Sequence, residues 1–94
     1  MELDKVKDIV CKQLEITTDQ LCSKSKVREV SIARNIYIYF ALANCPSPNI
    51  VARSIGLTTR CVNMSAQNIE ERIKYDRVFT YFFNVVKSDI ECSK

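Results

Sequence analysis

Three polar side chains in the second half of the chain have the types and the spacing needed to read DNA bases. Arg60, Asn63 and Gln67 are three and four residues apart, so on a helix they share one face. In the major groove, arginine pairs with guanine, and asparagine or glutamine pairs with adenine. Helices that read the groove usually contact bases through their N-terminal part. These residues therefore predict base contacts by a helix that begins just before Arg60.

The residues that precede this face have the signals of a helix-turn-helix motif. Ser47 is a good N-cap, and Pro48 suits the first position of a helix. Gly56 can adopt the positive φ that ends that helix, and either Thr58 or Thr59 can cap the next one. Ala52, Val51, Ile55, Leu57 and Val62 are the small and apolar residues expected to hold the two helices together.

Basic and hydroxyl side chains around this motif could bind phosphates. Six basic residues and one acidic residue lie between Lys24 and Arg60, whereas the rest of the chain has eight basic and ten acidic residues. A helix N-terminus adds free N–H groups and a partial positive charge. A solvated basic face without a partner is the alternative. The predicted phosphate contacts are Lys24, Lys26, Arg28, Arg34, Thr58 and Thr59.

The rest of the chain indicates an all-α fold. One glycine and two prolines leave little material for β-hairpins. Apolar residues recur at helical spacing, so we expect a compact bundle of about five to six helices in a single domain of residues 1–94. The expected helices cover residues 3–15, part of 16–22, 27–43, the motif at about 47–75, and a last helix capped by Asp76.

Two of these helices have core stripes that can be listed. In the helix that carries the base-reading residues, the predicted core stripe leaves Met64 on the opposite, exposed face. The stripe consists of Val62, Ala66, Ile69 and Ile73. In the last helix, the residues predicted to close the core are Val78, Phe79, Phe82, Val85, Val86 and Ile90.

Composition argues against several classes of protein. The chain has no histidine and one glycine, so neither a histidine-based catalytic centre nor a glycine-rich phosphate loop can be built. Its five cysteines form no CxxC pair, which favours free thiols in a reducing cytosol over a zinc site. No apolar run approaches the ~18 residues of a membrane span. We therefore expect no enzyme, no metal or cofactor, no nucleotide and no membrane contact.

The segment SKSKVREVSIARNIYIYFA, followed by the motif and then by NIEERIKYD, resembles the C-terminal DNA-binding domain of the bacterial replication initiator DnaA. In that family a basic loop leads into a long helix with an arginine-led stretch, and a helix-turn-helix follows. The resemblance extends from about Lys5 to Phe83 and is most specific from Ser23 to Ala43. It implies an all-α domain that binds double-stranded DNA.

Residue by residue, the resemblance is uneven. Lys26 stands where the family often has an arginine that enters the minor groove, and Arg28, Arg34 and Asn35 stand where the family contacts the backbone or nearby bases. At the start of the recognition helix the family has Asp-His-Thr-Thr-Val, and this chain has Thr-Thr-Arg-Cys-Val, of which only Val62 matches. The resemblance therefore does not imply recognition of the initiator's usual box sequence.

The initiator's ATPase domain has no counterpart in these 94 residues, so we expect a DNA-binding accessory or regulator rather than an initiator. Double-stranded DNA is the expected partner, with a replication or regulatory protein as a second, and the expected location is the cytoplasm, at the nucleoid. The alternative is a protein–protein interaction module that has lost sequence-specific DNA binding. In that case the exposed face around Met64 would contact a protein, because a thioether suits an adaptable apolar contact.

Overall fold

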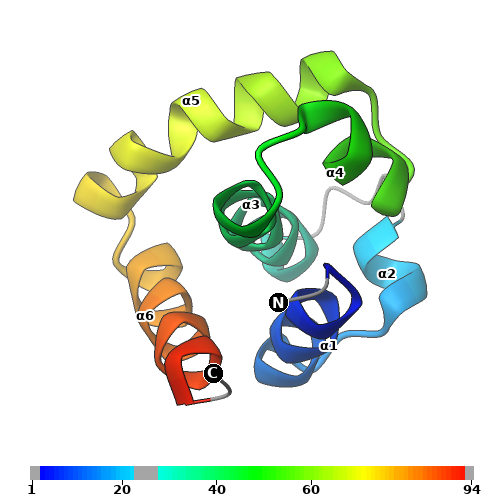
Figure 1. Ribbon diagram of the computed structural model, residues 1–94. Coiled ribbons are helices and arrows are strands. Elements are labelled where there is room, and N and C mark those ends of the chain that lie inside the picture. The colour runs from blue at the N-terminus through cyan, green and yellow to red at the C-terminus, as the bar shows by residue number, and fades with distance from the viewer. Residues whose placement is uncertain (1–2, 23–27, 93–94) are drawn as a thin grey trace.

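The computed structural model describes residues 3–22 and 28–92, and every element of regular structure in this part of the chain is a helix (Figure 1). This confirms the predicted all-α class. The described residues form six helices, the upper limit of the expected five to six. They are α1 (Leu3–Leu14), α2 (Thr18–Cys22), α3 (Arg28–Asn44), α4 (Pro48–Ser54), α5 (Thr59–Tyr75) and α6 (Arg77–Cys92).

Helix α3 is the centre of the bundle and contacts each of the other five helices. Seen along its axis in Figure 1, it is surrounded by α1, α2, α4, α5 and α6. Its residues Ile36, Tyr37 and Ile38 are all fully buried, although they point in three different directions from a helix. A helix that is apolar nearly all round is stable only when it is covered on all sides.

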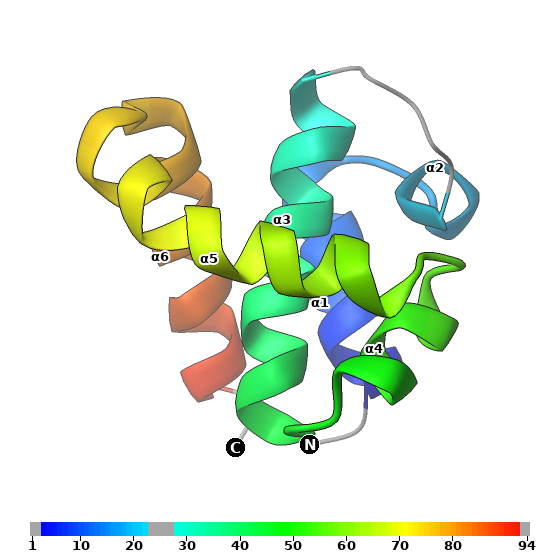
Figure 2. The ribbon, with the colours of Figure 1, turned by 90° about the horizontal axis from the view of Figure 1, so that it is seen from above.

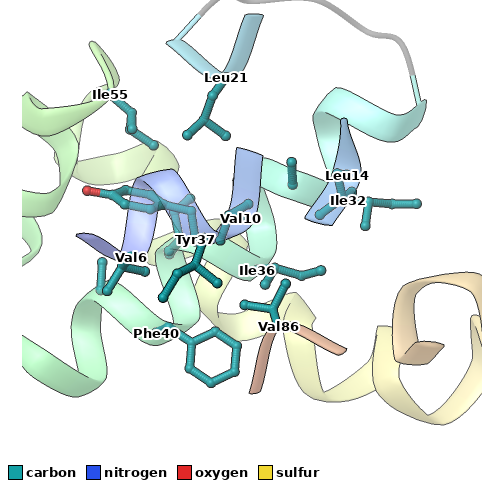
Figure 3. Packing of buried hydrophobic residues seen from close by; sticks show 14 of the residues in the cluster. Val6, Val10, Leu14, Leu21, Ile32, Ile36, Tyr37, Phe40, Ile55 and Val86 are labelled. Carbon is teal, nitrogen blue, oxygen red and sulfur yellow. The ribbon is translucent and has the colours of Figure 1, made fainter. Parts of the chain in front are cut away.

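The core takes side chains from all six helices, and Tyr37 lies within it (Figure 3). Val6 and Val10 come from α1, Leu21 comes from α2, and Val86 comes from α6. The Tyr37 hydroxyl reaches the edge of this core and hydrogen-bonds the Ser54 hydroxyl at the end of α4. Burial raises the pKa of the Tyr37 phenol. This tyrosine therefore fills the core and also fixes the position of α4 against α3.

The turn between α4 and α5 has the predicted geometry. Gly56 has a φ of +69°, and the backbone N–H of Leu57 donates to the Ala52 carbonyl at 2.9 Å. A second bond, from the Gly56 N–H to the Arg53 carbonyl, completes a Schellman motif at the end of α4. Leu57 then packs against the core. The residue that predicts the turn, Gly56, therefore adopts the conformation expected of it.

The structure shows which residues cap α4 and α5, including which of Thr58 and Thr59 caps α5. Ser47 occupies the N-cap position of α4, but its side chain makes no capping hydrogen bond. Between Thr58 and Thr59, it is Thr58 that caps α5, since its Oγ1 accepts from the Cys61 N–H at 3.2 Å. Helix α5 then crosses α3 at a steep angle, with its outer side free along its length (Figure 2).

The last helix packs in a different register from the predicted one. Asp76 caps α6 as expected, because its Oδ1 accepts from the backbone N–H groups of Val78 and Phe79. Phe79 is buried, but Val78 is 43% exposed and Phe83 takes a place in the core. Val86 and Ile90 are buried as predicted, Phe82 packs against the core, and Val85 is half-buried. Val78 and Phe83 lie about 140° apart around the helix, so the orientation that buries Phe83 turns Val78 outward. The residues of α6 that are buried are Phe79, Phe83, Val86 and Ile90.

Candidate nucleic-acid interface

The outer face of α5 carries the three side chains that the sequence predicts to read bases. Arg60, Asn63 and Gln67 are all exposed, and Met64 between them is 53% exposed. The opposite side of the helix holds the predicted core stripe, in which Val62 and Ile69 are buried and Ala66 and Ile73 are half-buried. The structure thus brings these polar side chains to one solvent-facing surface, which we call the α5 face (Arg60, Asn63, Met64 and Gln67).

The charge along α5 changes from its N-terminal to its C-terminal half. Arg60 is the one charged residue in its first two turns, whereas the second half has two acids, Glu70 and Glu71, beside two basic residues, Arg72 and Lys74. Arg53, an exposed residue of α4, adds a positive charge on the first helix of the motif. The end of the motif nearest the turn is therefore the end that suits a polyanion.

The two threonine hydroxyls at the start of α5 are engaged within the protein. Thr58 accepts the capping bond described above, and Thr59 Oγ1 donates to Asn49 Oδ1 on α4. The Thr58 hydroxyl keeps its proton for a further acceptor, such as a phosphate oxygen. The Thr59 hydroxyl uses its proton to join the two helices of the motif. Contact of either threonine with a phosphate stays a prediction.

Arg28 does not stand free at the start of α3. Its Nη2 lies 3.3 Å from Asp76 Oδ1, at the junction of α5 and α6. The pKa of Asp76 is lowered, mainly by the hydrogen bond from the Phe79 N–H and also by the Arg28 charge. The Arg28 side chain is 65% exposed and has further N–H donors, so a phosphate contact remains a prediction, made in competition with this ion pair.

Arg34 and Asn35 lie in a hollow between α3 and α5 rather than on the open surface. Arg34 is half-buried, and Asn35 is only 8% exposed. Arg72 of α5 lines the same hollow, together with Ser31, Leu57, Cys61 and Ser65. A ligand must enter this hollow to reach Asn35. Sequence reasoning missed Arg72 because only the crossing of α3 and α5 brings it near Arg34.

Lys24 and Lys26 lie outside the described residues, so their phosphate contacts stay predictions. All five cysteines are free thiols, as expected; Cys11 is buried, and burial raises its pKa. Within residues 3–22 and 28–92, no cluster of three or more potential metal ligands occurs. None of the described helices is long and apolar enough to cross a membrane.

The comparison with known families decides the identity of this fold. The model of the bacterial DnaA protein helix-turn-helix family matches residues 3–69. The chain belongs to this family. The match covers α1 to α4 and more than half of α5, including the whole α5 face, whereas α6 lies beyond it. No curated protein matches the chain.

Membership of this DNA-binding DnaA helix-turn-helix family agrees with the pattern of burial at the start of α5. Val62, the residue of the recognition-helix signature that is kept, is fully buried against the core. The four residues before it, which differ from the family's, are exposed or half-buried: Thr58, Thr59, Arg60 and Cys61. Within this five-residue segment, the core residue is therefore kept and the side chains that differ are exposed or half-buried.

Proposed function

We propose that this protein binds double-stranded DNA by placing the N-terminal half of α5 in the major groove. The observation that carries the proposal is the α5 face, where Arg60, Asn63 and Gln67 point to solvent from the second helix of a helix-turn-helix. The backbone N–H groups at the start of α5, with the Thr58 hydroxyl, would bind a phosphate. Arg34, Arg53 and the predicted contacts Lys24 and Lys26 would add phosphate contacts beside it.

The sequence that is read is expected to differ from the family's usual box. The side chains at positions 58–61 are replaced, and Arg60 favours guanine where it meets a base. Because the side chains that face the groove are altered on a kept scaffold, we propose an accessory or regulatory role in replication or transcription, at the nucleoid.

Substitutions on the α5 face test this function. Arg60→Ala and Asn63→Ala should each weaken binding to a preferred duplex by roughly 5–150-fold, which corresponds to ~1–3 kcal/mol per base contact. Asn68→Ala is the matched control, since Asn68 is an exposed asparagine of the same helix that lines a hollow at the α5–α6 junction. Fluorescence anisotropy with labelled duplexes measures the effect. Equal affinities for all three variants and the unmodified protein would contradict base reading by α5.

A second function is favoured by one observation, the 53% exposure of Met64 at the centre of the α5 face. On a protein-binding module, this thioether would form the middle of an apolar contact. Met64→Ala should then abolish a protein contact, whereas on DNA it should change affinity little unless it touches a thymine methyl. Arg60→Glu should have the opposite pattern, because a negative charge in the groove repels phosphates.

A further inference from the structure

Helix α6 has a second apolar seam, on the side away from the core. Val78, Tyr81, Val85, Ser88 and Cys92 follow one another at spacings of three, four, three and four residues, which is the a and d pattern of a heptad repeat. Val78 is 43% exposed and Tyr81 is 64% exposed. The buried residues of α6 lie on its other side. The bundle therefore buries one stripe of α6 and leaves another, the α6 seam (Val78, Tyr81, Val85, Ser88 and Cys92), exposed except for the half-buried Val85.

Opposite charges flank the two ends of this seam. Arg77 precedes Val78, and Glu91 precedes Cys92, so both occupy the same flanking heptad position. Both are exposed, and neither forms an ion pair within the described part of the chain. Two identical helices that pair antiparallel bring each Arg77 to the Glu91 of the other copy. In a parallel pair, the like charges would lie at the same end.

We infer that α6 pairs antiparallel with α6 of a second copy of this chain, forming a two-fold symmetric dimer. In this register Tyr81 of each copy lies opposite Val85 of the other, and two Arg77–Glu91 pairs close the ends. A hollow beside the seam, lined by Gln13, Tyr81, Asn84 and Val85 among others, can receive the facing Tyr81 ring. Helix α6 joins the C-terminal end of α5, so the seam is separate from Arg60 and Asn63 at the other end (Figure 1).

The charge pair makes the inference testable by exchange. Arg77→Glu and Glu91→Arg should each weaken dimerisation by roughly tenfold at low salt, because each creates two repulsive pairs. The double variant should restore the original affinity. Both substitutions complement the dipole of α6, so neither should impair folding. Lys87→Glu is the control, a charge reversal at an exposed position of α6 outside the seam.

Sedimentation equilibrium without DNA provides the measurement, so failure of DNA binding would not affect it. The mass should rise with concentration from the monomer value of 10.8 kDa to twice that value. Tyr81→Lys should abolish this rise while circular dichroism shows the same helix content. A mass of 10.8 kDa at all concentrations up to about millimolar would overturn the inference. So would a dimer that neither Tyr81→Lys nor the single charge reversals weaken, or a double variant no better than the single ones.

Discussion

The guanidinium of Arg28 and the carboxylate of Asp76 are 3.3 Å apart, although 48 residues separate them in the chain. Asp76 Oδ1 also accepts the N–H groups of Val78 and Phe79, so one oxygen caps α6 and holds the start of α3. This contact joins the first turn of the central helix to the junction of α5 and α6. A residue outside the family match therefore links the central helix to the α5–α6 junction.

Removing the Asp76 carboxylate should destabilise the protein. Asp76→Ala loses the cap of α6, which costs about 1 kcal/mol for a typical aspartate cap, and also loses the contact with Arg28. Chemical denaturation measures the free energy of unfolding. Asp8→Ala, which removes an exposed carboxylate from α1, should change this free energy little. Equal stabilities for the two variants would show that Asp76 does not hold the junction.

The same carboxylate should make stability depend on pH. The pKa of Asp76 is lowered in the folded protein, chiefly by the Phe79 N–H and then by Arg28. Its contribution is therefore present above the unfolded aspartate value of about 3.9 and is lost as the pH falls through the folded value. Asp76→Asn should show a smaller loss of stability between about pH 5 and pH 2. Parallel stability curves for Asp76→Asn and the unmodified protein would contradict this assignment.

Gly56 should resist substitution because of its backbone conformation rather than for lack of space. A Cβ at this position would come no closer than 3.9 Å to the Cys22 carbonyl oxygen, which is ordinary contact. The positive φ of 69° is the obstacle, and Gly56→Ala should cost about 1–2 kcal/mol. Gly56→Asn should cost less, since asparagine tolerates this region. Thermal unfolding of both variants checks the order; a more stable alanine variant would be inconsistent with it.

The Tyr37 hydroxyl should matter for stability, whereas that of Tyr75 should not. Tyr37→Phe leaves the Ser54 hydroxyl with its bond to the Val51 carbonyl but removes the link from α3 to α4, at a cost of about 0.5–1.5 kcal/mol. Tyr75 is 83% exposed, so Tyr75→Phe is the matched control. Guanidinium denaturation of the two variants gives the comparison. A loss of stability in Tyr75→Phe alone would reverse our interpretation.

Local signals were sufficient to predict the motif. Pro48, Gly56 and Thr58 set the limits of α4 and α5 through backbone geometry that depends on few neighbours. The core stripe of α5 also fixed which side chains face solvent, so the α5 face could be located from spacing alone.

Features that depend on how helices cross could not be predicted in this way. Asn35 was expected to contact DNA or its backbone, and its burial beside Arg72 follows from the angle between α3 and α5. Two apolar stripes on α6 made its orientation ambiguous, so Val78 was expected in the core and Phe83 was not. The partner of Arg28 is 48 residues away, and no local pattern indicates such a pair.

The central claim, that this chain binds duplex DNA through its basic motif, is tested most directly by the salt dependence of binding. Anisotropy of the purified protein is measured at 50 and 200 mM salt on one duplex with an initiator-type box and one with a scrambled box. If about four phosphates are neutralised, affinity should fall roughly 10²-fold between the two salt concentrations. We predict this loss on both duplexes. Absence of binding to either duplex at 50 mM salt, or binding that salt does not weaken, would contradict the account.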